Sequence, residues 1–197
     1  EKSAARKRLG LPDCLTILSA GGSQGASRIN DAVVHLLSYE QKKGNINHIH
    51  GYGKHGKDTF MQSLAENGVD PDNEHFIIKE YIDNMYTCMC ASDLIITRAG
   101  AMTLTELMAI GRASILIPYP YAAENHQYYN ALTLQNANAG RIIDDKELTG
   151  AVLIDAVTKL ADDPELLKLM SENAAKLSKH DAAGVILREI TDLMGLE

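Results

Sequence analysis

Residues 94–131 read LIITRAGAMTLTELMAIGRASILIPYPYAAENHQYYNA, and this stretch decides the fold. Its apolar runs and helix-forming segments predict two strands and two helices in alternation, over residues 94–97, 103–110, 115–117 and about 124–137. The two loops that lead from strand to helix lie near Gly100 and Ala122. In a parallel sheet such loops meet at the carboxyl ends of adjacent strands, where α/β folds bind their ligands.

The rest of the chain repeats this alternation. Further strands are predicted over residues 15–19, 46–50, 76–79 and 141–143, with helices between them. The tail is predicted to be helical, over residues 148–160, from Pro164 onward and over 184–193. The predicted fold class is therefore α/β: a Rossmann-like, doubly wound parallel sheet of about six strands with helices on both faces.

Composition and charge exclude several classes of protein. The net charge is −7 and no Lys/Arg cluster longer than a pair follows Arg8, which argues against nucleic acid as a partner. No apolar run approaches the roughly 20 residues that span a bilayer, so no transmembrane segment is expected. The three cysteines, Cys14, Cys88 and Cys90, are interpreted as buried free thiols of a cytoplasmic protein. The histidines, His180 included, lack metal-ligand spacing, so no metal is expected.

A glycine-rich loop, GGSQGA at residues 21–26, follows the first predicted strand. Glycines let the backbone approach a ligand closely, and the helix that follows favours a phosphate at its N-terminus. The spacing differs from the dinucleotide fingerprint, and His48, Ile49 and His50 stand where an acidic ribose ligand would be expected. A nicotinamide cofactor is therefore disfavoured and no cofactor is predicted. A tight turn without a ligand remains the alternative.

The loop at Gly100 repeats the arrangement of strand, small residues and helix. Thr103 can cap the helix, and its backbone N–H group can face an anion. Glu106 follows three residues later, which leaves two interpretations open. It either folds back onto the helix start as part of a capping box, or accepts hydrogen bonds from the vicinal hydroxyls of a ribose.

The cluster at residues 122–127 opens another helix beside the previous one. His126, Gln127 and Asn130 offer donors and acceptors that suit sugar hydroxyls, and His126 can also carry a proton. A single histidine at a helix start is, however, commonly structural.

Three more polar residues lie at the ends of predicted strands and helices. Asp83 and Asn84 are most simply N-caps. Arg98 ends a strand and lies either near a phosphate or beside one of the many carboxylates. No Ser/His/Asp order with a nucleophile elbow is present. What remains is a site for a nucleotide phosphate with sugar-binding groups, as in a transferase whose leaving group is a diphosphate.

Three motifs in order resemble one family. GGSQGA (21–26), RAGAMTLTEL (98–107) and IPYPYAAENHQYYNA (117–131) are similar to the C-terminal half of MurG-type N-acetylglucosaminyltransferases. The resemblance covers nearly the whole chain from Leu15. It implies one half of a two-domain GT-B fold that binds UDP-N-acetylglucosamine, and a whole protein that adds GlcNAc to lipid-linked N-acetylmuramoyl-pentapeptide in peptidoglycan synthesis. It also implies a peripheral protein on the cytoplasmic face of the bacterial plasma membrane.

The resemblance assigns roles to the residues that match its motifs. Ser23, between Gly22 and Gln24, would contact the diphosphate, and the backbone of Ile82 would pair with the edge of uracil. The phosphate would also meet the helix start at Ala101, Met102 and Thr103.

The remaining assignments concern the two sugars. The resemblance favours the ribose role for Glu106, while His126 and Gln127 would face the GlcNAc hydroxyls. The family commonly has Gln-Gln at this last pair, so His126 departs from its pattern.

The resemblance also implies a domain division. Residues 1–13 would be a linker or lead-in and residues 14–197 the donor-binding domain. The N-terminal domain, which would hold the acceptor and the catalytic base, is absent, so we expect donor binding without turnover. The alternatives are a non-catalytic nucleotide-sugar-binding or partner-docking subunit of a split glycosyltransferase, or part of a sugar-nucleotide epimerase with the same architecture.

Overall fold

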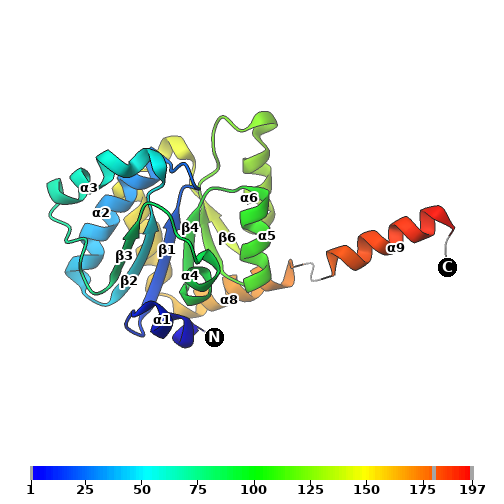
Figure 1. The fold of residues 1–197 in the computed structure, drawn as a ribbon, viewed down its shortest axis with the longest axis horizontal. Coiled ribbons are helices and arrows are strands. Elements are labelled where there is room, and N and C mark those ends of the chain that lie inside the picture. Colours follow the sequence, from blue (N-terminus) through cyan, green and yellow to red (C-terminus); the bar gives the residue numbers. More distant parts are fainter. Residues whose placement is uncertain (1, 179–180, 196–197) are drawn as a thin grey trace.

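Six parallel strands form a single sheet in the computed structural model, which describes residues 2–178 and 181–195 (Figure 1). The strand order is β3-β2-β1-β4-β5-β6, which is the order of a doubly wound fold and confirms the predicted class. The strands are β1 Leu15–Ala20, β2 Ile46–Gly51, β3 Phe76–Lys79, β4 Leu94–Thr97, β5 Ala113–Leu116 and β6 Gly140–Ile142.

Helices follow each of the first five strands and form the tail. The α-helices are α1 Lys2–Leu9, α2 Ser27–Lys43, α3 Lys57–Glu66, α4 Met85–Ala91, α5 Ala101–Ile110, α6 His126–Asn136, α7 Gly150–Ala161, α8 Pro164–Lys176 and α9 Ala182–Met194. Short 3₁₀ turns lie at η1 Lys54–Gly56, η2 Ala123–Asn125 and η3 Asp145–Glu147.

The core has two layers because successive strand side chains point to opposite faces of the sheet. Ile17 and Ile96 face the layer formed with α2, α3 and α7, whereas Leu18 and Ile95 face the layer formed with α4, α5 and α6. All four side chains are buried. Each such side chain contributes about 1.5–3 kcal/mol relative to exposure, so the alternation fixes the strand register.

The direction of winding reverses between β1 and β4, which pair in parallel next to one another. The chain moves outward from β1 to β2 and β3 on one side, then crosses back to β4 and continues to β6. A crevice forms at such a reversal, outside the carboxyl ends of the two strands. The loops after β1 and β4 are the Gly21 and Gly100 loops that the sequence singled out.

The N-terminal helix α1 is fastened to the opposite, amino edge of the sheet (Figure 1). The Arg6 side chain is buried and donates hydrogen bonds to Asp13, Asp93 and the Ala91 carbonyl. Asp93 also accepts from the backbone of Thr16, at the start of β1. A buried guanidinium with two carboxylate partners is well compensated, so Arg6 holds α1 against the sheet.

Helix α9 projects away from the body of the domain (Figure 1). It is amphipathic, but its large apolar side chains are exposed: Val185, Ile186, Leu187, Ile190, Leu193 and Met194. Within the residues that the structure describes, no helix is long and apolar enough to cross a membrane.

Candidate functional site

Two adjoining cavities, of about 280 and 80 Å³, lie at the carboxyl ends of β1 and β4. They share the walls formed by Ala20, Gly22, Met85 and Glu106. The larger cavity is completed by Ser23, Gly51, Glu80, Tyr81 and Ile82, and the smaller by Leu18, Met89, Ile95, Ile96, Thr97 and Thr103. An apolar floor with a few polar groups at its rim is the usual composition of a small-molecule site.

The glycine loop owes its shape to two left-handed residues. Gly22 has φ 92° and Gly25 has φ 86°, a region that disfavours any residue with a Cβ. The Gly25 amide donates to the Gly22 carbonyl at 3.0 Å, and a Cβ on Gly25 would overlap the carbonyl oxygen of Tyr52. The exposed Ser23 hydroxyl has no partner within the described part of the chain. The loop therefore presents Ser23 to the cavity on a fixed backbone.

All five helices that follow β1 to β5 start at this edge without a side-chain cap, and three of them, α2, α5 and α6, follow the loops that the sequence singled out. The residues before α2, α5 and α6 are Ala26, Gly100 and Asn125, and none of them makes a capping hydrogen bond. The tail helices α7, α8 and α9 differ, since each is capped by a side chain: Thr149, Asp163 and Asp181. Uncapped first-turn N–H groups and the positive end of the helix dipole together favour an anion.

Of the two interpretations left open for Glu106, the capping box with Thr103 is wrong. Helix α5 begins at Ala101, so Thr103 already lies inside its first turn and Gly100 occupies the N-cap position. At α5 the helix therefore starts two residues before Thr103, which cannot cap it. Of the expected N-caps Asp83 and Asn84, Asn84 does occupy the N-cap position of α4, but its side chain makes no capping hydrogen bond.

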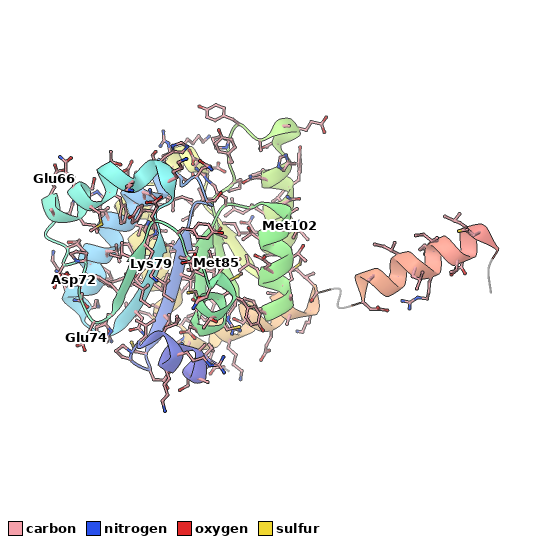
Figure 2. The ribbon with its side chains drawn as sticks, in the orientation of Figure 1. Glu66, Asp72, Glu74, Lys79, Met85 and Met102 are labelled. Carbon is pink, nitrogen blue, oxygen red and sulfur yellow. The ribbon has the colours of Figure 1, made fainter. Side chains whose placement is uncertain are left out.

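Glu106 does not cap α5, since the helix begins at Ala101. Its exposed side chain lines both cavities, and no hydrogen bond or ion pair to it is found among residues 2–178 and 181–195. The carboxylate one turn into α5 is therefore available to a ligand in the cavity. Ala101 and Met102 at the start of the same helix are exposed, and Met102 is marked in Figure 2.

The loop between β5 and α6 has a strained backbone and is held by hydrogen bonds between its own residues. Glu124 and Asn125 both have left-handed backbones, so α6 starts at His126, two residues later than expected. The His126 Nδ1–H group donates to the Ala123 carbonyl at 2.9 Å, which leaves its Nε2 atom free for a ligand. The Gln127 side-chain oxygen accepts from the Tyr119 amide at 3.0 Å. Neither residue lines the two cavities.

Arg98 belongs to an ion-pair cluster and not to a free phosphate site. Its guanidinium lies 2.6 Å from Asp145, stacks over the Tyr119 ring and donates to the Ile117 carbonyl. Arg28 of α2 pairs with the same carboxylate at 3.2 Å. Of the two interpretations left open for Arg98, the structure favours the carboxylate. Sequence reasoning missed Asp145 because the pairing spans a long separation along the chain.

The structure thus brings together five of the ten residues expected at the site. Gly22, Ser23, Ile82, Thr103 and Glu106 line the two cavities, whereas Gln24, Ala101, Met102, His126 and Gln127 lie on the loops and helix starts outside them. Glu80, Tyr81 and Met85 were not anticipated. Their position just after β3 was the available signal, since ligands gather at strand ends.

A larger cavity of about 470 Å³ lies at the opposite, amino edge of the sheet, between α1 and α8. Three of its four lining cations are already engaged: Lys2 and Arg6 pair with Asp93, and Arg112 donates to backbone carbonyls that end α4 and α5, whereas Lys168 has no partner among the described residues. Volume alone therefore does not make it the functional site.

Cysteine and histidine placement bears on the remaining expectations. Cys88 is buried, but Cys14 and Cys90 are only partly buried, so the expectation of three buried thiols is wrong for two of them. Across the described ranges no group of three or more His, Cys, Asp or Glu side chains is arranged to hold a metal. His180 lies outside the described residues.

The strand order and the cleft at the reversal define the class: this is a Rossmann-like domain of the kind found in GT-B glycosyltransferases. The model of the glycosyltransferase family 28 C-terminal domain matches residues 16–186, and the chain belongs to this family. The resemblance to MurG-type enzymes is thereby confirmed.

Two curated relatives of this chain share one name. The chain is 40% identical over 183 residues to the UDP-N-acetylglucosamine–N-acetylmuramyl-(pentapeptide) pyrophosphoryl-undecaprenol N-acetylglucosamine transferase of Desulforamulus reducens, which covers 92% of this chain and 49% of that protein. The protein of that name from Thermoanaerobacter sp. is 40% identical over 193 residues, covering 98% and 52%. The chain therefore spans about half the length of these curated relatives.

Solved structures agree in fold. Acinetobacter baumannii MurG superposes with a TM-score of 0.80 at 29% identity, over 91% of this chain and 52% of that one. Staphylococcus aureus MnaA in complex with UDP superposes with a TM-score of 0.69, over 100% of this chain and 49% of that one. Its 12% identity shows the fold alone.

Proposed function

We propose that this chain binds UDP-N-acetylglucosamine as the donor half of an inverting glycosyltransferase that makes a peptidoglycan precursor. The observation that carries the proposal is the unpartnered Glu106 carboxylate beside a glycine loop and an uncapped helix start, all on one cavity. The names of the relatives support the donor and the acceptor, which is lipid-linked N-acetylmuramoyl-pentapeptide.

Each part of the donor is assigned to particular residues in and around the cavities. The Ile82 backbone would pair with uracil, and Glu106 would accept hydrogen bonds from the two ribose hydroxyls. Ser23, with Gly22 and Gln24 beside it, would contact the diphosphate on one side, and the α5 start at Ala101, Met102 and Thr103 would contact it on the other. His126 and Gln127 would face the GlcNAc hydroxyls, through the free His126 Nε2 atom and the Gln127 amide N–H group.

The chemistry that this half supplies is stabilisation of the leaving group. An acceptor hydroxyl would attack the anomeric carbon while the bond from that carbon to the β-phosphate oxygen breaks, and UDP would leave with the electron pair. Negative charge grows on the diphosphate as this bond breaks. N–H groups and helix dipoles that are already aimed at it lower the barrier without reorganising.

The acceptor and the base that takes its proton would belong to the half of the relatives that this chain does not cover. We therefore propose that the chain binds the donor without transferring it. We further propose that residues 14–197 form the donor domain, that residues 1–13 lead into it from the other half, and that the whole protein works peripherally on the cytoplasmic face of the membrane.

A titration of the 197-residue chain tests the proposal, with heat of binding and thermal stabilisation as readouts. UDP and UDP-N-acetylglucosamine are expected to bind, UDP-glucose to bind less tightly because it lacks the acetamido group, and NAD not to bind. Binding of NAD together with no response to UDP would refute the proposal.

A further inference from the structure

Four buried polar side chains form one hydrogen-bonded chain beneath the glycine loop. The Ser19 hydroxyl lies 2.6 Å from His48 Nε2 and 2.7 Å from His50 Nδ1, and His48 Nδ1 lies 2.7 Å from the Glu40 carboxylate. Each of these residues is at most 1% exposed. The order Glu–His–Ser is that of a hydrolytic triad, but a fully buried hydroxyl cannot reach a substrate. The hydrogen-bonded network therefore needs another explanation.

Ser19 is the central member of this chain. A serine hydroxyl has one proton, so it donates to one imidazole and accepts from the other. Burial lowers the pKa of His50 well below its ordinary value, so this ring is neutral, and it lies against the Phe60 ring with the two centroids 4.7 Å apart. Among the described residues His50 Nε2 already has no partner, so loss of the hydroxyl would leave both ring nitrogens of His50 and the Nε2 atom of His48 unpartnered, which is costly in a dry interior.

The two strands that this hydrogen-bonded network joins, β1 and β2, continue directly into the walls of the site. Ser19 and His50 are paired residues of β1 and β2, and the next pair, Ala20 and Gly51, lines the larger cavity. Beyond them the two loops stay in contact, because the Lys54 amide donates to the Ser23 carbonyl at 3.2 Å.

Helix α2 is the third element that the hydrogen-bonded network holds. Glu40 lies on α2 and is connected through His48 to β2, so the same hydrogen bonds fix α2 against the sheet. The N-terminus of α2 immediately follows the glycine loop. The network therefore holds the strand residue directly before the loop, and it also holds the C-terminal part of the helix that follows the loop.

We propose that Ser19, His48, His50 and Glu40 are positioning residues that hold the glycine loop in its ligand-binding geometry. This inference rests on the proposed function, in which the loop contacts the donor diphosphate. Their polar network is expected to govern donor affinity, although none of the four touches the donor.

The test compares Ser19→Ala with Ser114→Ala in the 197-residue chain. Ser114 is a matched control because its hydroxyl is also fully buried in a central strand and has no hydrogen-bond partner among the described residues. The dissociation constant for UDP is expected to rise about tenfold in Ser19→Ala and to change by less than about twofold in Ser114→Ala. Equal affinity of the unsubstituted chain and folded Ser19→Ala overturns the inference.

A second measurement needs no variant. Nitrogen NMR of the histidine rings reports their protonation and hydrogen bonds, and UDP is expected to shift the ring signals of His48 and His50. If these signals do not move on saturation with UDP, the inference is overturned. This measurement uses the unsubstituted chain, so it decides the question even if Ser19→Ala does not fold. Failure of the unsubstituted chain to bind UDP refutes the proposed function, and this inference falls with it.

Discussion

Replacement of Glu106 by alanine separates ligand binding from stability. The carboxylate has no partner among the described residues, so its removal is expected to change the free energy of unfolding by less than about 0.5 kcal/mol. In the proposed complex it accepts two hydrogen bonds from ribose hydroxyls. Hydrogen bonds to a charged group are each worth about 1.5–3 kcal/mol, and exposure to solvent reduces this, so a total of about 2–3 kcal/mol is expected.

The dissociation constant for UDP should therefore rise about 30- to 150-fold in Glu106→Ala. Calorimetric titration measures the affinity, and urea unfolding without ligand measures the stability. Glu74→Ala is the matched control, because Glu74 is also exposed and without a partner in the described part, but lies on the opposite side of the molecule from Met102 (Figure 2). Unchanged UDP affinity would refute the ribose role, and lowered stability without ligand would return Glu106 to a structural one.

Three further predictions concern a cap, a glycine and a thiol. Asp163→Ala removes the carboxylate that accepts from the Leu166 amide at 2.9 Å, so thermal melting should fall by about 2–4 °C for a loss of about 1 kcal/mol, with UDP affinity unchanged. Gly25→Ala places a Cβ on a left-handed residue against the Tyr52 carbonyl, and urea unfolding should show a loss of about 1–3 kcal/mol. Burial raises the pKa of Cys88, so less thiolate forms and its alkylation by iodoacetamide at pH 8 should be slower than that of free cysteine, as followed by mass spectrometry.

The fold could be predicted from the sequence because its signals are local. Apolar runs such as residues 94–97 coincide with β4, and Gly111 ends α5 in a left-handed conformation as its type suggests. Helix starts were predicted less well. The sequence predicted helix starts at residue 103 and at about residue 124, whereas α5 begins earlier, at Ala101, and α6 begins later, at His126.

The site was predictable only in part, for a different reason. Motifs mark the loops, so Ser23 and Glu106 were found, but partners that meet across the fold carry no local signal. The pairing of Arg98 with Asp145 and the buried contact of Ser19 with two histidines depend on strand order and helix placement. Short-range spacing therefore could not distinguish an arginine that is free for phosphate from one that is already paired.

The uncapped start of α5 connects local stability with binding. Gly100 has φ −68° and ψ 144°, which any residue can adopt, and a Cβ there would meet only the Thr103 hydroxyl at 4.0 Å. Gly100→Asp would thus supply the missing cap from the chain itself and should raise the free energy of unfolding by about 0.5–1 kcal/mol. The new carboxylate would occupy the N–H groups proposed for the diphosphate and repel its charge, so UDP should bind more weakly although the protein is more stable. If Gly100→Asp binds UDP as tightly as the unsubstituted chain, the start of α5 does not hold the diphosphate.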